Sequence, residues 1–301
     1  MNDIKQDNLI FKIFPSFTHP YITLMRLDRP IGFLLLFYPI SFSLVSQRNY
    51  NYELLKYFIL FFIGSVVMRS AGCVINDILD KKIDKKVKRT QSRPLASSKL
   101  TILKACVTLV ILLLIGLLIL INLNMPSIVL GFLIIPLVIL YPLAKRFFAL
   151  PQLILAMTYN WGCMIGWVAI SSPYNFNNIF ILYLSLVIWT IVYDTIYAVQ
   201  DEEEDRKMNL YSTAVLFGSK KLLILNSLII IQYFLLIVFG YKMDYGIIFY
   251  VIVALISLLN LRDINFLWKN EAQKSGLYFK RNNYYGFLIL LSIIIGSQFN
   301  V

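Results

Sequence analysis

Residues 102–121 read Ile-Leu-Lys-Ala-Cys-Val-Thr-Leu-Val-Ile-Leu-Leu-Leu-Ile-Gly-Leu-Leu-Ile-Leu-Ile, with Lys104 as the single charged side chain. A helix of about 20 apolar residues can cross the hydrocarbon core of a bilayer, because it satisfies its own backbone hydrogen bonds there. Comparable stretches recur along the chain, and we expect nine spanning helices. They lie near residues 24–46, 54–76, 102–121, 125–144, 151–171, 178–200, 222–240, 245–261 and 284–301.

The overall composition agrees with a polytopic membrane protein. Of 301 residues, 59% are hydrophobic and only 15% are charged, and the mean hydropathy is +0.72. Soluble domains carry about a quarter charged residues, so a soluble globular protein and a disordered chain are both excluded. The three cysteines lie in apolar stretches without paired spacing, which excludes a disulfide scaffold.

The net charge of +12 is distributed unevenly. The N-terminal segment and the loops after the even-numbered spans hold 23 of the 28 Lys and Arg residues, whereas the opposite side holds only Arg48 and Lys242. The positive-inside rule therefore places the N-terminus and those loops in the cytosol. The first twenty residues lack the apolar run of a signal peptide. We expect a bacterial inner-membrane protein whose residues 1–20 form a cytosolic segment.

Nine of the 16 acidic residues fall within two short windows, residues 76–84 and 194–205. Asn76, Asp80 and Asp84 are spaced by four, so a continuing helix would align them on one face. The second window repeats this feature, since Asp194, Asp201 and Asp205 are spaced by seven and four. Isolated acids at helix ends are commonly solvated flanks, but two matched clusters favour a functional site.

Each acidic window follows an even-numbered span, and four spans separate the two windows. This spacing predicts an all-α fold of two pseudo-repeated four-helix halves plus a ninth helix, with both windows facing a central cavity. Carboxylate and amide oxygens without nearby His or Cys suit a hard cation, and Mg²⁺ is usual when a substrate brings phosphates. Nearby Lys and Arg residues could hold such a polyanion, although many of them also serve topology. Arg69 differs, because it lies inside an apolar span.

Two motifs resemble the signatures of the UbiA family of membrane prenyltransferases. The first is Gly72-Cys-Val-Ile-Asn-Asp-Ile-Leu-Asp-Lys-Lys-Ile-Asp84, followed by Val87-Lys-Arg-Thr-Gln-Ser-Arg-Pro-Leu95. The second is Asp194-Thr-Ile-Tyr-Ala-Val-Gln-Asp-Glu-Glu-Glu-Asp205, followed by Ser212-Thr-Ala-Val-Leu-Phe-Gly218. Tyr141 and Lys145 match the family's Tyr-x-x-x-Lys, and Leu24–Gly32 also fits. The resemblance extends from about residue 20 to 297, which predicts a single domain over residues 1–301.

The resemblance implies Mg²⁺-dependent transfer of a polyprenyl group from a polyprenyl diphosphate to 4-hydroxybenzoate, ortho to the hydroxyl, in ubiquinone synthesis. It implies catalytic roles for Asp80, Asp84, Asp194, Asp201 and Asp205. Metal ligands would come from Asn76, Asp77, Asp80, Asp84, Asp201 and Asp205. The diphosphate would contact Arg69, Lys81, Arg89, Arg93, Tyr141, Lys145 and Arg146, and the acceptor would contact Arg26 or Arg29.

Other functions remain open at the level of the sequence. The same transfer could use another acceptor, such as a naphthoate or haem B. Acids within a repeated helical bundle also suit a divalent-cation or lipid-phosphate transporter, but transporter sites usually lie near the bilayer centre. The predicted position at the cytosolic helix ends favours a lipid-linked polar substrate and no nucleic acid. The glutamates at 202–204 leave open which inner acids of the second motif bind metal.

Overall fold

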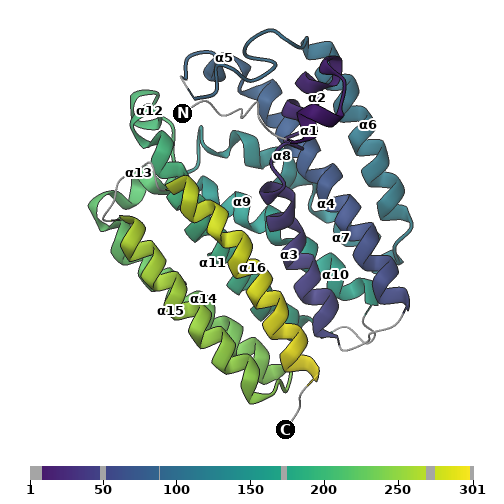
Figure 1. The fold of residues 1–301 in the computed structure, drawn as a ribbon, viewed down its shortest axis with the longest axis vertical. Coiled ribbons are helices and arrows are strands. Elements are labelled where there is room, and N and C mark those ends of the chain that lie inside the picture. The colour runs from purple at the N-terminus through teal and green to yellow at the C-terminus, as the bar shows by residue number, and fades with distance from the viewer. Residues whose placement is uncertain (1–8, 48–51, 88, 171–174, 269–274, 299–301) are drawn as a thin grey trace. The chain divides into compact units, whose positions relative to one another are not determined.

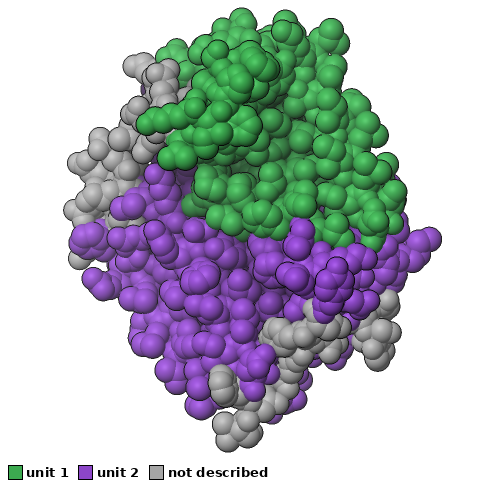
Figure 2. All heavy atoms as spheres, turned by 45° about the vertical axis from the view of Figure 1, so that its right-hand side comes forward, with its two compact units in different colours: residues 1–34, 60–122 green, residues 35–59, 123–301 purple. Residues whose placement is uncertain are grey.

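The computed structural model of the chain describes residues 9–47, 52–87, 89–170, 175–268 and 275–298. Within these ranges every regular element is a helix, which confirms the predicted all-α class (Figure 1). The chain divides into two compact units, which are coloured separately in Figure 2. Unit 1 comprises residues 1–34 and 60–122, and unit 2 comprises residues 35–59 and 123–301.

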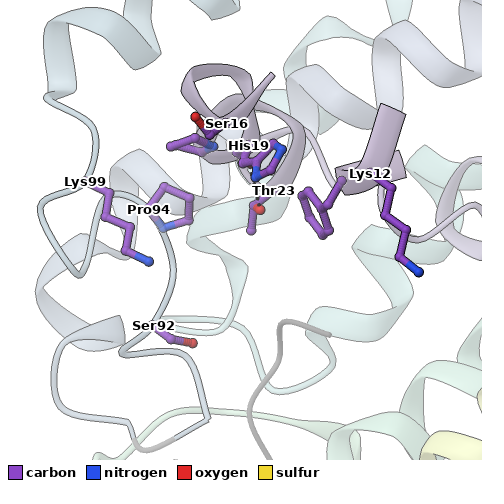
Figure 3. Close-up of a pocket in the computed structure, with 9 residues that line it drawn as sticks. Lys12, Ser16, His19, Thr23, Ser92, Pro94 and Lys99 are labelled. Atoms are coloured by element: carbon purple, nitrogen blue, oxygen red, sulfur yellow. Dashed lines mark hydrogen bonds between the residues drawn. The ribbon is translucent and has the colours of Figure 1, made fainter. Parts of the chain in front are cut away.

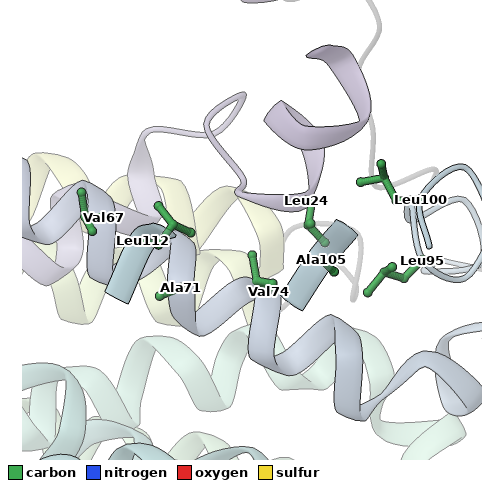
Figure 4. Close-up of a cluster of buried hydrophobic side chains, with 8 residues drawn as sticks. All are labelled: Leu24, Val67, Ala71, Val74, Leu95, Leu100, Ala105 and Leu112. Carbon is green, nitrogen blue, oxygen red and sulfur yellow. The ribbon is translucent and has the colours of Figure 1, made fainter. Parts of the chain in front are cut away.

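Unit 1 contains the first acidic motif. Its elements are α1 (Leu9–Ile13), η1 (Ser16–Thr18), α2 (His19–Leu24), the part of α4 (Tyr52–Leu79) from residue 60 onward, α5 (Lys81–Asp84) and α6 (Ile102–Ile121). A cluster of buried apolar side chains joins α2, α4, the loop after the motif and α6 (Figure 4). Its buried members are Leu24, Val67, Ala71, Val74, Leu95, Leu100, Ala105 and Leu112. This cluster fixes the loop against the helix end that carries the acids.

Helix α6 has apolar side chains on nearly all sides. Only Ala105 and Leu112 of this helix are buried, whereas side chains such as Leu103, Val107 and Leu114 are exposed within the unit. A helix that is apolar all round belongs inside a membrane or a large core. The exposed face of α6 is therefore suited to contact lipid.

Unit 2 contains the second acidic motif. It includes α3 (Ile31–Ser46) from residue 35 onward and α4 up to residue 59. Its other helices are α7 (Met125–Leu133), α8 (Ile135–Ala144), α9 (Pro151–Asn160), α10 (Gly162–Ile170), α11 (Phe176–Ala198), η2 (Val199–Asp201), α12 (Glu202–Lys207), α13 (Thr213–Phe217), η3 (Gly218–Lys220), α14 (Lys221–Lys242), α15 (Ile247–Trp268) and α16 (Ser275–Gln298). Helix α11 packs against α9, α14 and α16, and about half of its side chains are buried. The second motif thus extends from the most enclosed helix of its unit.

Two predicted spans are interrupted. The stretch 125–144 forms α7 and α8, which meet at Ile134. Pro136 explains this break, because its ring nitrogen cannot donate to the preceding turn. The stretch 151–171 forms α9 and α10, which meet at Trp161. The residue that follows is Gly162, where a Cβ atom would lie 2.6 Å from Cγ1 of Ile40.

Among the described residues, seven helices or helix pairs are long and apolar enough to cross a membrane. Helix α3 is apolar but has only 16 residues, because it starts at Ile31 rather than at the predicted residue 24. Helix α16 has 24 residues and begins at Ser275, earlier than the predicted residue 284. The chain is therefore a multi-pass helical membrane protein, while the count of nine spans and the repeated halves stay predictions.

Candidate functional site

The first motif lies where a long helix gives way to a short one. Helix α4 ends at Leu79, Asp80 occupies the junction with φ −93° and ψ 4°, and α5 begins at Lys81. The prediction of a continuing helix is therefore wrong at this position. Two bonds of helical spacing persist, from Asp80 N to Asn76 O and from Asp84 N to Asp80 O, both at 2.8 Å. The carboxylates of Asp80 and Asp84 are both buried.

The second motif also contains a break between two helices. Helix α11 ends at Ala198, a 3-10 turn leads to Asp201, and α12 begins at Glu202. Asp201 has φ −107° and ψ 2°, close to the values at Asp80. In both motifs a further aspartate follows four residues later, at Asp84 and at Asp205. The predicted single face of the second window is thus also interrupted by a break in the helix.

Two arginines bind the aspartates of the first motif. The guanidinium of Arg26 contacts both carboxylate oxygens of Asp77, with Nη2 at 2.8 Å and 3.1 Å. Arg93 donates from Nη1 to Asp77 at 3.2 Å and to Asp84 at 3.1 Å. The side chain of Asp77 is 1% exposed, so these contacts are largely shielded from water. Charge-assisted hydrogen bonds of this kind fix both carboxylates in place.

The position of Arg26 depends on an unusual backbone conformation. Helix α2 ends in a Schellman motif, with Leu27 N bonded to Ile22 O and Arg26 N bonded to Thr23 O. Arg26 occupies the left-handed position of this motif, with φ 58°, where glycine is the common residue. Its Nη1 donates a hydrogen bond to the backbone oxygen of Thr23 at 2.6 Å. The left-handed turn therefore directs a guanidinium toward Asp77.

The loop after the first motif contributes a second support. The hydroxyl of Thr90 donates to the backbone oxygen of Asp84 at 3.2 Å. Burial raises the pKa of the Asp84 carboxyl above its ordinary value, Arg93 opposes this shift, and the nearby Asp77 adds to it. Additional positive charge beside Asp84 would therefore favour its ionised form.

The other predicted cations of unit 1 occupy different surroundings. A Cβ atom on Gly32 would lie 2.8 Å from Nε of Arg69, so the glycine leaves room for this intramembrane guanidinium. Arg29 donates from Nε to Asp28 at 3.0 Å. Lys81 and Arg89 are half-buried at the start of α5 and in the following loop. All of these residues lie in the same unit as the first motif.

In the second motif, the first glutamate is neutralised by cations. Glu202 forms an ion pair with Lys221, and Arg206 donates to Glu202 at 3.0 Å. Glu203 is exposed. Asp194, Asp201 and Asp205 are half-buried. Both carboxylate oxygens of Glu202 are therefore engaged by cations of the chain.

Unit 2 brings the predicted Tyr-x-x-x-Lys segment next to the loop that follows the second motif. Helix α12 ends in another Schellman motif, with left-handed Asn209 and a bond from Leu210 N to Asp205 O at 2.9 Å. The next residue donates from Tyr211 N to the backbone oxygen of Lys145 at 2.8 Å. Lys145 caps the end of α8. Tyr141 is half-buried one turn earlier, whereas Arg146 is exposed.

A stripe of aromatic side chains runs along α11 toward the second motif. Trp189, Tyr193 and Tyr197 are spaced by four and therefore share one face. The rings of Trp189 and Tyr193 are 5.6 Å apart, and Phe279 of α16 lies 5.6 Å from Tyr193 and 4.9 Å from Tyr197. Asp194 directly follows Tyr193, so its side chain lies on a different face of α11 from these rings.

Three supporting residues were not predicted from the sequence. Lys221 is buried against Glu202, although its position after a basic loop suggested a topological charge. Gln152 accepts a hydrogen bond from Thr213 N at 2.9 Å and so holds the segment after the second motif. Thr90 donates a hydrogen bond to the backbone oxygen of Asp84. Only its place in the Arg-Thr pair of the loop could have indicated this role from the sequence.

The acids of both motifs fit a magnesium ion that is shared with a phosphate ligand. Within the described ranges, no group of three His, Cys, Asp or Glu residues is arranged to hold a metal by itself. Mg²⁺ commonly takes one or two carboxylates and completes its shell with water and phosphate oxygens. Each motif can offer the one or two aspartate carboxylates that a Mg²⁺ ion needs. Fixed cations beside the motif could contact the same phosphate.

Comparisons with known proteins agree on one family. Residues 35–289 match the UbiA prenyltransferase family. The chain is 39% identical over 294 residues to the mitochondrial 4-hydroxybenzoate polyprenyltransferase of Drosophila pseudoobscura pseudoobscura, covering 97% of this chain and 74% of that protein. It is 36% identical over 273 residues to the 4-hydroxybenzoate octaprenyltransferase of Haemophilus ducreyi, covering 91% of this chain and 98% of that protein.

Solved structures show the same fold. A UbiA homolog from Aeropyrum pernix K1 has a TM-score of 0.72 and 25% identity, covering 88% of this chain and 97% of that one. A UbiA homolog from Archaeoglobus fulgidus, bound to GPP and Mg²⁺, has a TM-score of 0.68 and 18% identity, covering 90% of this chain and 99% of that one.

Proposed function

The chain belongs to the UbiA prenyltransferase family, and on that basis we propose that it transfers a polyprenyl group from a polyprenyl diphosphate to 4-hydroxybenzoate. The curated relatives with 36% to 39% identity over most of the chain carry names for this activity. The product is the 3-polyprenylated acid, an intermediate of ubiquinone synthesis.

The two acidic motifs would hold Mg²⁺. The ligands would come from Asn76, Asp77, Asp80, Asp84, Asp201 and Asp205. When bound, Mg²⁺ neutralises charge on the diphosphate and so makes it a better leaving group. The matching junction conformation of Asp80 and Asp201 supports equivalent roles for the two motifs and is consistent with repeated halves.

Fixed cations would hold the remaining diphosphate oxygens. We assign this role to Arg69, Lys81, Arg89, Arg93, Lys145 and Arg146, with the neutral hydroxyl of Tyr141 as a further hydrogen-bond donor. The carboxylate of the acceptor would bind Arg26 or Arg29. Both arginines are paired, Arg26 with Asp77 and Arg29 with Asp28, but the side chain of Arg29 is 28% exposed and that of Arg26 only 12%. Arg29 is therefore the better candidate for a direct contact, and Arg26 would act mainly by positioning Asp77.

In the reaction, the allylic carbon–oxygen bond breaks and the diphosphate leaves with the bonding electron pair. The ring carbon ortho to the phenol attacks the allylic carbon, and the ring then loses a proton. We assign the acceptance of that proton to Asp194, a half-buried carboxylate of the second motif. Tyr193 and Tyr197 would shield the allylic cation from water and stabilise it through their ring faces.

The proposed architecture is a single domain over residues 1–301 with nine spanning helices around a central cavity. The basic loops and both motifs would face the cytosol of a bacterium, with the chain in the inner membrane. The named relatives include both bacterial and mitochondrial proteins. The charge distribution of the sequence supports this orientation.

One observation carries the proposal: both family motifs are present, and each places an aspartate at a break between two helices. Turnover by the purified chain in liposomes tests it, with a polyprenyl diphosphate and one acceptor at a time. We expect product with 4-hydroxybenzoate and little with a dihydroxynaphthoate or haem B. Faster turnover of either alternative would reassign the acceptor, and no transfer to any acceptor would contradict the proposed reaction.

A further inference from the structure

Unit 1 contains a cavity that the proposed reaction does not use. It has a volume of about 440 Å³ and lies between the N-terminal turns and the loop after the first motif (Figure 3). The described residues that line it are Phe11, Lys12, Ser16, His19, Pro20, Thr23, Ser92, Pro94 and Lys99. Two of these carry a positive charge, and none is acidic. The lining therefore favours an anion.

The polar groups of the cavity are partly oriented in advance. His19 Nε2 lies 2.8 Å from the backbone oxygen of Phe14, which can only accept, so this nitrogen donates its proton there and fixes the ring that lines the cavity. The hydroxyl of Ser92 is buried and has no hydrogen-bond partner among the described residues. Leaving such a hydroxyl unsatisfied is costly, and an anion oxygen would accept its proton.

The surroundings of the cavity indicate a lipid. Exposed apolar side chains occur on the same N-terminal segment, at Leu9 (70% exposed), Ile13 (67%) and Phe17 (75%). Lys99 lies just before the apolar helix α6, which begins at Ile102. A cation at that position would lie at the level of the lipid headgroups when α6 spans the bilayer. Apolar side chains beside lysines are typical of segments that lie in the membrane interface.

From these observations we propose that this cavity binds a phosphate group, supplied by the headgroup of an anionic lipid. Lys12 and Lys99 would provide charge, and the hydroxyl of Ser92 would donate to a phosphate oxygen. The lipid chains would extend along the exposed apolar residues of the N-terminal segment. The proposal concerns binding alone and does not depend on the prenyl transfer reaction.

The cavity is adjacent to the residues that hold the first motif. Ser92 and Pro94 flank Arg93, which binds Asp77 and Asp84. The backbone oxygen of Thr23 accepts from Arg26, which also binds Asp77. A bound phosphate would therefore stabilise the two segments that supply both arginines.

Calorimetric titration of the full chain in a zwitterionic detergent tests the proposal. The probes are dioctanoyl phosphatidic acid, dioctanoyl phosphatidylcholine, glycerol 3-phosphate and inorganic phosphate. We expect phosphatidic acid to bind at least about tenfold more tightly than phosphatidylcholine. Losing charge-assisted contacts in a Lys12→Gln/Lys99→Gln variant should weaken binding by roughly ten- to a hundredfold.

Two matched variants separate this site from general charge and from the proposed active site. Lys104→Gln removes an exposed lysine nearby on α6 and should change the affinity by less than about twofold. Asp80→Asn should retain lipid binding even where prenyl transfer is lost. Glycerol 3-phosphate or phosphate binding as tightly as phosphatidic acid would support a phosphate site filled from solution.

Three results would overturn the proposal. They are the absence of binding by every anion, equal affinity for phosphatidylcholine, and equal losses in the Lys104→Gln and Lys12→Gln/Lys99→Gln variants. Thermal unfolding of each variant without ligand shows whether it is folded. Because Lys12 and Lys99 are exposed, their replacement should leave the fold unchanged.

Discussion

At the scale of single residues, Arg26 occupies a position that local backbone structure would give to glycine. A left-handed conformation costs a non-glycine residue about 1–2 kcal/mol. The chain retains arginine there, and its guanidinium binds Asp77 with 12% of the side chain exposed. The ion pair thus offsets a local conformational cost.

This assignment predicts an order of stability among Arg26 variants. Both Arg26→Gly and Arg26→Ala lose the ion pair, but the glycine variant also relieves the strained backbone. We expect the unfolding free energy of Arg26→Gly to exceed that of Arg26→Ala by about 1 kcal/mol, so that the glycine variant unfolds at a higher temperature. Both variants should unfold at a lower temperature than the parent chain. Thermal unfolding in detergent measures this order, and an alanine variant that is the more stable of the two would contradict it.

Kinetics of two cation variants distinguish acceptor from donor binding. Arg29→Gln should raise the KM for 4-hydroxybenzoate by roughly ten- to a hundredfold, since it would remove a charge-assisted hydrogen bond. The KM for the polyprenyl diphosphate should change little. Lys145→Gln should show the opposite pattern. If Arg29→Gln altered both constants equally, or neither, the acceptor carboxylate would have to bind elsewhere.

At the scale of elements, the short helices α5 and α12 present the last aspartate of each motif. Neither begins at a glycine or proline, so the sequence contains no ordinary signal for the junctions at Asp80 and Asp201. Arg93, which lies 16 residues beyond Asp77 in the sequence, supplies a tertiary contact that local patterns do not show. Periodicity therefore placed the acids on a helix face but missed the break in the helix.

The cap of α12 provides a test at this scale. Asn209 is exposed and left-handed, and it ends the helix that carries Asp205. Asn209→Gly should preserve stability and turnover, because glycine adopts this conformation readily. Asn209→Val should lower the unfolding free energy by about 1–2 kcal/mol and reduce turnover. Thermal unfolding and prenyl transfer assays measure both effects, and equal behaviour of the two variants would exclude a role for the cap.

At the scale of the whole molecule, the sequence predicted the helical membrane class and the bounds of several spans. Residues 102–121 match α6 at both ends, because Thr101 caps the helix start and Asn122 follows its end. The first helix was predicted too long, since the Schellman turn at Arg26 separates α2 from α3. Contacts such as Arg26–Asp77, 51 residues apart in sequence, depend on tertiary packing and could not be inferred from spacing.

Labelling from either side of the membrane tests the predicted orientation. Cys73 and Cys163 are buried and Cys106 is half-buried, so each would first be replaced by serine or alanine. New cysteines at Ser97 and Ser219, both exposed, should react only from the cytosolic side. A cysteine at the exposed Asn175 should react only from the outside. Labelling of position 97 from the outside would reverse the proposed topology.

The central claim is that both acidic motifs serve Mg²⁺-dependent prenyl transfer to 4-hydroxybenzoate. The most direct measurement is the turnover of the parent chain, Asp80→Asn, Asp201→Asn and the matched control Glu203→Gln in liposomes, with Mg²⁺ or with EDTA. We predict Mg²⁺-dependent product for the parent, a loss of about 100-fold or more for each aspartate variant, and less than about twofold change for Glu203→Gln. Near-parental turnover by either aspartate variant, or by the parent chain in EDTA, would contradict this account.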